Sequence, residues 1–156
     1  MLADPALSPP EGHARRPRRA SALAPWQQTE VRAFAEAFFA DEGGPPSAAH
    51  LGYAVDELGQ LLAHAGMRSQ LLFGASVLTM AFLVPAVLLG RFQRFSRLSI
   101  DERLKALHRS ETSPAGLAVF LIRALTSIVF YEHPDGARAI RWDQRCLAAP
   151  QQGTRS

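Results

Sequence analysis

Residues 69–90 form a run of 22 positions without a charged side chain, bracketed by Arg68 and Arg91. A helix of this length would extend roughly 33 Å, which is enough to cross the hydrocarbon part of a bilayer. Pro85 interrupts the run and predicts a kink. Two interpretations stay open: a kinked, wholly buried central helix of a small helical domain, which we favour, and residues 71–90 spanning or dipping into a membrane.

The first half of the chain predicts two further helices. Over residues 27–40 the apolar side chains recur at helical spacing, and the Gly-Gly-Pro-Pro sequence within 41–47 must end that helix. Ser47 stands where an N-cap belongs. The predicted apolar faces are Val31, Phe34, Ala35, Phe38 and Phe39 in the first helix, and Leu51, Val55, Leu58, Leu62 and Ala65 in the second.

The second half begins with a capping-box pattern, Ser99-Ile-Asp-Glu102, which predicts a short helix over residues 100–108. Ser113-Pro114 predicts another N-cap, with proline at the first helical position. The apolar run 117–131 should be a mostly buried helix, ended by a turn at 133–136 and followed by a short helical turn at 137–141.

No segment alternates with the period of two that is typical of a half-buried strand. The predicted fold is therefore all-α: a compact bundle of about five helices with one long, very apolar central helix. A chain of 156 residues allows one core of ordinary size. We expect a flexible basic arm over residues 1–25, a single helical domain over 26–146 and a flexible tail over 147–156.

Charge is segregated along the chain although the net charge is only +3. Residues 26–65 hold six acids and one arginine, and residues 66–110 hold seven bases and two acids. These blocks could pair with each other or with a partner, but solvated faces of opposite sign are the interpretation we favour.

Sequence patterns of catalysis are missing. The chain has no glycine-rich nucleotide-binding turn, and its five histidines are scattered, which indicates surface or cap residues. Cys146 is the single cysteine, so no intramolecular disulfide can form, and a half-buried structural thiol is expected. The sequence therefore offers no catalytic residue, no metal ligand and no cofactor-binding residue.

Two basic clusters bear on targeting and on nucleic-acid binding. No apolar stretch follows the arginines within residues 15–19, so they do not form a convincing signal peptide. Arg91, Arg94 and Arg97 recur every third residue, which predicts one stripe at a helix end that complements the helix dipole. We therefore do not expect nucleic acid as a partner.

Residues 34–46, Phe-Ala-Glu-Ala-Phe-Phe-Ala-Asp-Glu-Gly-Gly-Pro-Pro, resemble the opening helix of the small subunit (subunit 3) of gluconate 2-dehydrogenase. A more specific likeness covers residues 94–110, which resemble the R-F-x-x-L-S-x-x-x-R stretch of those subunits and of the N-terminal helical region of long-chain alcohol oxidases. In those proteins an apolar helix ends in an aromatic residue and a proline turn, as Tyr131-Glu-His-Pro134 and Ile140-Arg-Trp-Asp143 suggest here. The likeness covers about residues 27–146.

The resemblance implies an accessory role. In that family the chemistry belongs to a flavin-dependent oxidoreductase of the glucose–methanol–choline type, and the helical part packs on it. We accordingly expect a non-catalytic small subunit that stabilises such an alcohol or sugar dehydrogenase or oxidase, with FAD held by the large subunit. The expected location is cytoplasmic or peripheral to the membrane, and export as part of a complex stays open.

The residues that we expect to contact the partner follow the uncharged run. They are Arg91, Arg94, Phe95, Arg97 and Leu98. An alternative places Phe95 and Leu98 in the core and the arginines at a helix end, where they would serve the fold alone.

Overall fold

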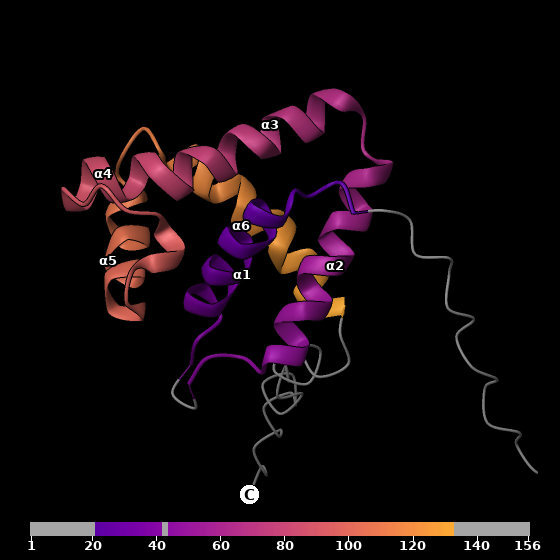
Figure 1. Cartoon of the computed structure of the whole chain (residues 1–156), viewed down its shortest axis with the longest axis horizontal. Coiled ribbons are helices and arrows are strands. Elements are labelled where there is room, and N and C mark those ends of the chain that lie inside the picture. Colours follow the sequence, from indigo (N-terminus) through magenta and orange to yellow (C-terminus); the bar gives the residue numbers. More distant parts are fainter. Residues whose placement is uncertain (1–20, 42–43, 133–156) are drawn as a thin grey trace, which may run out of the picture.

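The computed structural model describes residues 21–41 and 44–132, and within them the chain is all-α. Counting the continuous stretch Met67–Leu89 as one, there are five helices, which confirms the predicted fold class (Figure 1). The arm up to residue 20, the turns predicted at 133–136 and 137–141, Cys146 and the tail lie outside the described residues. The elements are α1 (Pro25–Phe38), α2 (Ala48–His64), α3 (Met67–Leu78), a π-helix (Thr79–Leu83), α4 (Val84–Leu89), a 3-10 turn (Phe95–Arg97), α5 (Ile100–Ser110) and α6 (Gly116–Glu132).

Helix α1 is the element around which the others pack, because it contacts α2, α3, α5, α6 and the 3-10 turn (Figure 1). Its predicted apolar face is confirmed at Val31, Phe34 and Ala35, none of which is exposed. Phe38 and Phe39 pack against the edge of the same core. Burial of such a stripe, rather than helix propensity, stabilises a helix of this length.

Helix α2 begins as predicted, since the Ser47 hydroxyl accepts a hydrogen bond from the His50 N–H at 3.2 Å. The packed part of the chain starts earlier than the boundary expected at residue 26. Leu23 is only 5% exposed and belongs to the core. The Ala22 N–H also donates to the Gly59 carbonyl of α2 at 3.2 Å. Residues 21–25 therefore belong to the folded unit rather than to the arm.

Pro85 does not break the long helix. It lacks an N–H, and its ring would collide with the carbonyl four residues earlier in a regular α-helix. The turn before it is widened into the π-helix Thr79–Leu83, and the Val84 N–H donates to the Thr79 carbonyl. The helix ends at Gly90, whose positive φ of 66° lets the Arg91 N–H donate back to the Pro85 carbonyl at 3.0 Å.

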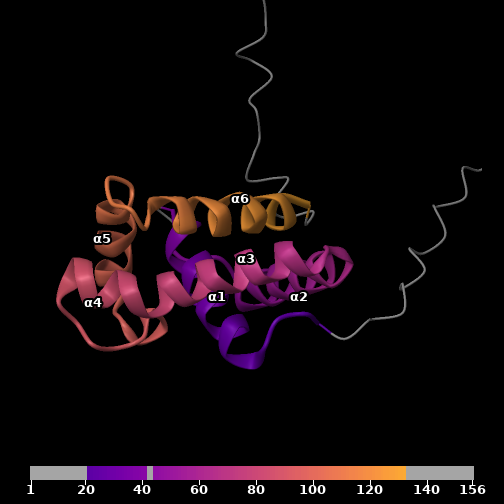
Figure 2. The same ribbon diagram turned by 90° about the horizontal axis from the view of Figure 1, so that it is seen from above.

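The expectation of a wholly buried central helix is wrong. One side of the helix is buried, with Phe73, Val77 and Met80 at most 1% exposed. The other side faces outward, and only 39% of its most apolar window is buried. In Figures 1 and 2 the helix lies along one side of the molecule, with α1 and α2 on its inner side. The sequence could not indicate this, because both sides of the helix are apolar.

Helix α6 runs beside α3 and is also less buried than expected (Figure 2). Val119, Ile122 and Val129 face the core, whereas Leu117 is 78% and Phe120 is 63% exposed. Its start also differs from the prediction. The Ser113 hydroxyl accepts from the Ala115 N–H at 3.2 Å, but the helix begins at Gly116 and Pro114 lies in the preceding turn.

Candidate functional site

Most residues of the R-F-x-x-L-S-x-x-x-R stretch are used by the fold itself. Phe95 is not exposed and Leu98 is 2% exposed, so both lie in the core, as the structural alternative predicted. Ser99 forms the predicted capping box. Its hydroxyl accepts from the Glu102 N–H at 3.3 Å, and the Glu102 carboxylate accepts from the Ser99 N–H at 3.2 Å. These side chains fix where α5 starts and how it leaves the core.

Arg103, the last residue of the stretch, joins the two charge blocks. Its guanidinium donates to the Glu36 carboxylate at 2.6 Å and to the Ser96 carbonyl at 2.7 Å. The Arg103 side chain is only 12% exposed, so solvent screens this pair less than an ordinary surface pair. The basic and acidic blocks therefore pair at one point within the chain.

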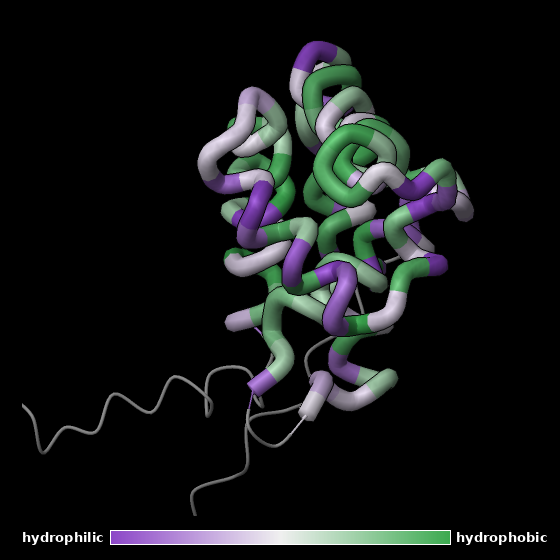
Figure 3. Tube along the Cα trace, turned by 90° about the vertical axis from the view of Figure 1, so that its left-hand side faces the viewer, coloured by the Kyte–Doolittle hydropathy of each residue, from purple (hydrophilic) through white to green (hydrophobic). Residues whose placement is uncertain are grey.

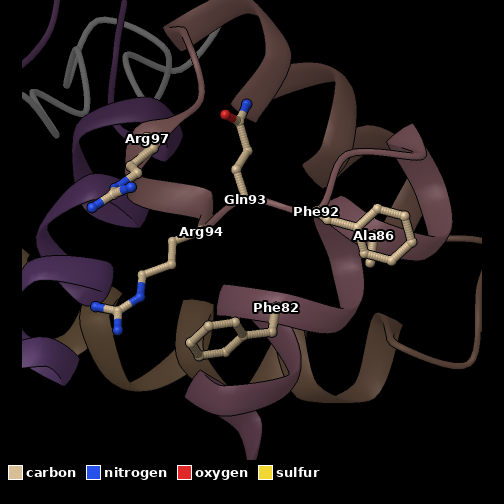
Figure 4. A pocket seen from close by; sticks show the side chains of 6 residues that line it. All are labelled: Phe82, Ala86, Phe92, Gln93, Arg94 and Arg97. Atoms are coloured by element: carbon tan, nitrogen blue, oxygen red, sulfur yellow. The ribbon is translucent and has the colours of Figure 1, made fainter.

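Arg94 is the exception within the stretch, because its side chain is exposed. Its guanidinium carbon lies 5.4 Å from the centre of the Phe82 ring, in cation–π contact. Arg97 is also exposed, and Figure 4 shows both guanidinium groups extending to the same side of the link. Within residues 21–41 and 44–132, neither arginine has an ion-pair partner.

These two arginines line an open groove of about 570 Å³, which we call the basic groove. Its floor comes from the π-helix and α4, and its wall comes from the link that passes beneath α4 in Figure 1. Phe92 is 96% exposed beside it. The groove is lined by Phe82, Ala86, Phe92, Gln93, Arg94 and Arg97 (Figure 4).

The expected arginine stripe at a helix end is wrong. Since Gly90 ends the helix, Arg91, Arg94 and Arg97 lie on the irregular link and its 3-10 turn. Arg91 forms an ion pair with Glu102 at 2.9 Å. The remaining two guanidiniums can donate bidentate hydrogen bonds to a carboxylate or phosphate. Together with the aromatic rings, they suit an acidic surface that carries apolar side chains.

A second groove, of about 510 Å³, lies between the long helix and the start of α6 and is almost entirely apolar. Leu72 and Leu83 line it from the long helix, and Leu117 and Phe120 line it from α6. This groove differs from the sequence-based prediction, in which the residues of α6 are mostly buried. The sequence does carry one signal of exposed apolar surface: both helices have apolar residues on all sides, more than one core can cover.

In the described part of the chain, the titratable side chains do not cluster into a catalytic or metal-binding site. No three histidine, cysteine, aspartate or glutamate residues there could share a metal ion. His50 is buried rather than on the surface, which corrects the sequence expectation. Its Nε2 lies 3.0 Å from the Phe130 carbonyl, and its ring stacks on Phe130 with centres 3.9 Å apart. This geometry fits a role in packing α2 against α6.

Tyr53 carries a perturbed phenol. Burial raises its pKa, and the negative charges of Glu57 and Glu132 raise it further. The neutral phenol is thus the form that the fold favours.

Comparison of the chain with protein-family models, with curated proteins and with solved structures gives no match.

Proposed function

We propose that this chain is a non-catalytic accessory subunit that binds and stabilises a flavin-dependent alcohol or sugar oxidoreductase of the glucose–methanol–choline type. The likeness of residues 94–110 to the small subunits of such enzymes supports this function. The observation that carries it is the position of Arg94. Phe95, Leu98, Ser99 and Arg103 engage in packing, capping or an ion pair within the fold, whereas Arg94 lines an open groove beside Arg97.

In this proposal the large subunit holds FAD and performs the redox chemistry. The accessory chain contributes the basic groove as a contact surface, with Arg94 and Arg97 donating to carboxylates of the large subunit. Phe92 supplies an exposed aromatic side chain of the kind that is enriched at protein interfaces. Phe95 and Leu98 act from within the core, where they hold the link in place.

A second candidate is a small membrane-anchored helical protein with residues 71–90 in the bilayer. The observation that favours it is the stretch Met67–Leu89, which has a mean hydropathy of 2.3 over its most apolar window and the length to cross a membrane. Spanning would require the core-facing side of this helix to leave the other helices. The accessory subunit is therefore the primary proposal.

Native affinity purification of the tagged chain from its own host tests the proposal. We expect a yellow eluate whose flavin absorbance and mass spectrum identify a glucose–methanol–choline oxidoreductase. A colourless eluate, with the chain recovered only in detergent extracts, would contradict the proposal and support the membrane-anchored protein.

Charge reversal then tests the contact surface. Arg94→Glu/Arg97→Glu should reduce recovery of the flavoprotein by at least about tenfold, since each lost charge-assisted hydrogen bond contributes about 1.5–3 kcal/mol. Lys105→Glu, an exposed change on α5, is the control and should leave recovery unchanged. If the double variant recovers as much flavoprotein as the control, the basic groove is not the contact.

A further inference from the structure

We propose that the outer apolar face of the long helix and the start of α6 docks on the surface of an anionic phospholipid bilayer, with the long helix lying in the membrane plane. This inference does not depend on the proposed function, because the apolar side chains that carry it do not line the basic groove; only Phe92 and the arginines of the link are common to both.

The docking surface, here called the upper face, consists of large apolar side chains that are each at least half exposed. Leu72 and Leu83 of the long helix line the apolar groove together with Leu117 and Phe120 of α6, so these four side chains form one continuous surface. Figure 3 shows long hydrophobic stretches of the trace in the upper part of the molecule, where the long helix lies. The members of the upper face are Leu71, Leu72, Leu78, Leu83, Val87, Leu117 and Phe120.

The helix can lie on a membrane with the fold intact, whereas spanning a membrane would disrupt the fold. Its inner side packs Phe73, Val77 and Met80 into the core, where each is at most 1% exposed. α1 and α6 contact this helix, and they carry charged residues such as Glu36 and Arg123. A spanning orientation would bring these helices into the hydrocarbon or uncover the core, whereas an in-plane helix buries only its outer side.

The charges around the upper face are complementary to anionic headgroups. Residues 67–97 contain four arginines and no acidic residue. Arg68 lies at one end of the long helix, and the arginines of the link follow the other end. A basic residue near an anionic membrane contributes about 1 kcal/mol to binding. Phe92, which is 96% exposed, follows the same end of the helix and adds an aromatic side chain of the kind that enters the membrane interface.

The chemistry of the upper face favours lipid over a protein or a second copy of the chain. Protein interfaces carry about one hydrogen bond per 100–200 Å². The long helix offers almost no group for such bonds, since residues 69–90 carry no charge and the Ser76 hydroxyl already donates to the Leu72 carbonyl at 2.9 Å. Lipid tails require no hydrogen-bonding partner, and the phosphates meet the arginines at the ends of the helix.

Vesicle flotation with the full purified chain tests the inference. We expect the chain to float with vesicles made of equal parts phosphatidylglycerol and phosphatidylcholine. Flotation should be weaker with pure phosphatidylcholine and at high salt, because screening removes the arginine contribution. Alkaline carbonate should release the bound chain, whereas retention after carbonate would show a spanning helix and overturn the in-plane arrangement.

Paired leucine substitutions identify the surface. Leu72→Ser/Leu83→Ser should lower the partition coefficient by at least about tenfold, because two exposed leucines no longer enter the bilayer. Leu61→Ser/Leu104→Ser is the matched control, since both leucines are 43% exposed on α2 and α5, and it should change binding less than about twofold. Equal binding of the two variants would overturn the proposal. A second result would also overturn it: the chain fails to float and forms a dimer, and only the Leu72→Ser/Leu83→Ser variant is monomeric. That result would assign the upper face to contact with a second copy of the chain.

Discussion

The Glu30 carboxylate accepts two hydrogen bonds from Ser96, one from the backbone N–H at 2.9 Å and one from the hydroxyl at 2.8 Å. Glu30 lies on the buried side of α1 and has no solvent exposure. Ser96 lies 66 residues later in the 3-10 turn, between Arg94 and Arg97. The two residues therefore fix the wall of the basic groove to α1.

Removing this carboxylate should destabilise the protein. Glu30→Ala leaves the partly buried Ser96 donors without their acceptor and creates a cavity, so we expect a loss of about 2–4 kcal/mol in the free energy of unfolding. Urea denaturation measures it. Asp56→Asn, an exposed change on α2, is the control and should stay within about 0.5 kcal/mol. A Glu30→Ala protein as stable as this control would show that the Glu30–Ser96 bonds contribute nothing.

Arg103 should not be replaceable by lysine. The guanidinium donates hydrogen bonds from two different nitrogens, one to Glu36 and one to the Ser96 carbonyl. The single ammonium group of a lysine cannot form both bonds in the same geometry. We expect Arg103→Lys to lower the free energy of unfolding by about 1.5–3 kcal/mol. Arg97→Lys, at an exposed position of the basic groove, should have no measurable effect on stability. If the two variants unfold at the same urea concentration, the paired contact of Arg103 is not stabilising.

Local signals in the sequence predicted the helices well. Ser47 and Ser99 cap helices because a hydroxyl placed before a helix satisfies an N–H in the first turn, and this depends only on neighbouring residues. The buried faces of α1 and α2 were also predicted, since each has one apolar side, except that Ala65 lies beyond the end of α2 and is only partly buried. Gly90 shows a signal that was overlooked: a glycine after the last apolar residue is typical of a helix end, and it excludes a helical stripe of arginines.

The candidate site and the exposed faces could not be predicted in the same way. The long helix and α6 are apolar on all sides, so periodicity cannot indicate which side the core covers. Leu72 and Val77 look alike in sequence, yet one is 60% exposed and the other is fully buried. Likewise, nothing near Glu30 indicates Ser96, because the two residues meet only when α1 packs against the link.

Tyr53 should make stability fall at alkaline pH. Burial and the two nearby glutamates raise its pKa above the ordinary value of 10.0, so the phenol of the unfolded chain ionises first. The contribution of the Tyr53 phenol to the free energy of unfolding is complete below pH 10, and it is lost as the pH rises through the pKa of Tyr53 in the folded state. Tyr53→Phe cannot ionise, so its stability should decline less between pH 9 and pH 11 in urea denaturation. Parallel declines in the two proteins would contradict the raised pKa of Tyr53.

Two glycines on α2 should respond to alanine in opposite directions. A Cβ at Gly52 meets nothing within 4 Å, so Gly52→Ala should stabilise the protein by about 0.5–1 kcal/mol through helix propensity. A Cβ at Gly59 would collide with the Ser21 side chain, whose segment packs Leu23 into the core. Gly59→Ala should therefore destabilise the protein by about 1–3 kcal/mol despite the same gain in propensity.

A double-mutant cycle separates this collision from other effects. In Ser21→Gly/Gly59→Ala the two closest atoms, the Ser21 Oγ and Cβ, are gone, and the Cα of residue 21 at 3.6 Å is in ordinary contact with the new methyl group. We expect the double variant to recover most of the stability that Gly59→Ala loses, with a coupling energy of about 1–2 kcal/mol in urea denaturation. Additive effects, with Ser21→Gly bringing no recovery, would mean that residues 21–23 do not pack against α2 at Gly59. The folded unit would then begin nearer to residue 26, as the sequence alone suggests.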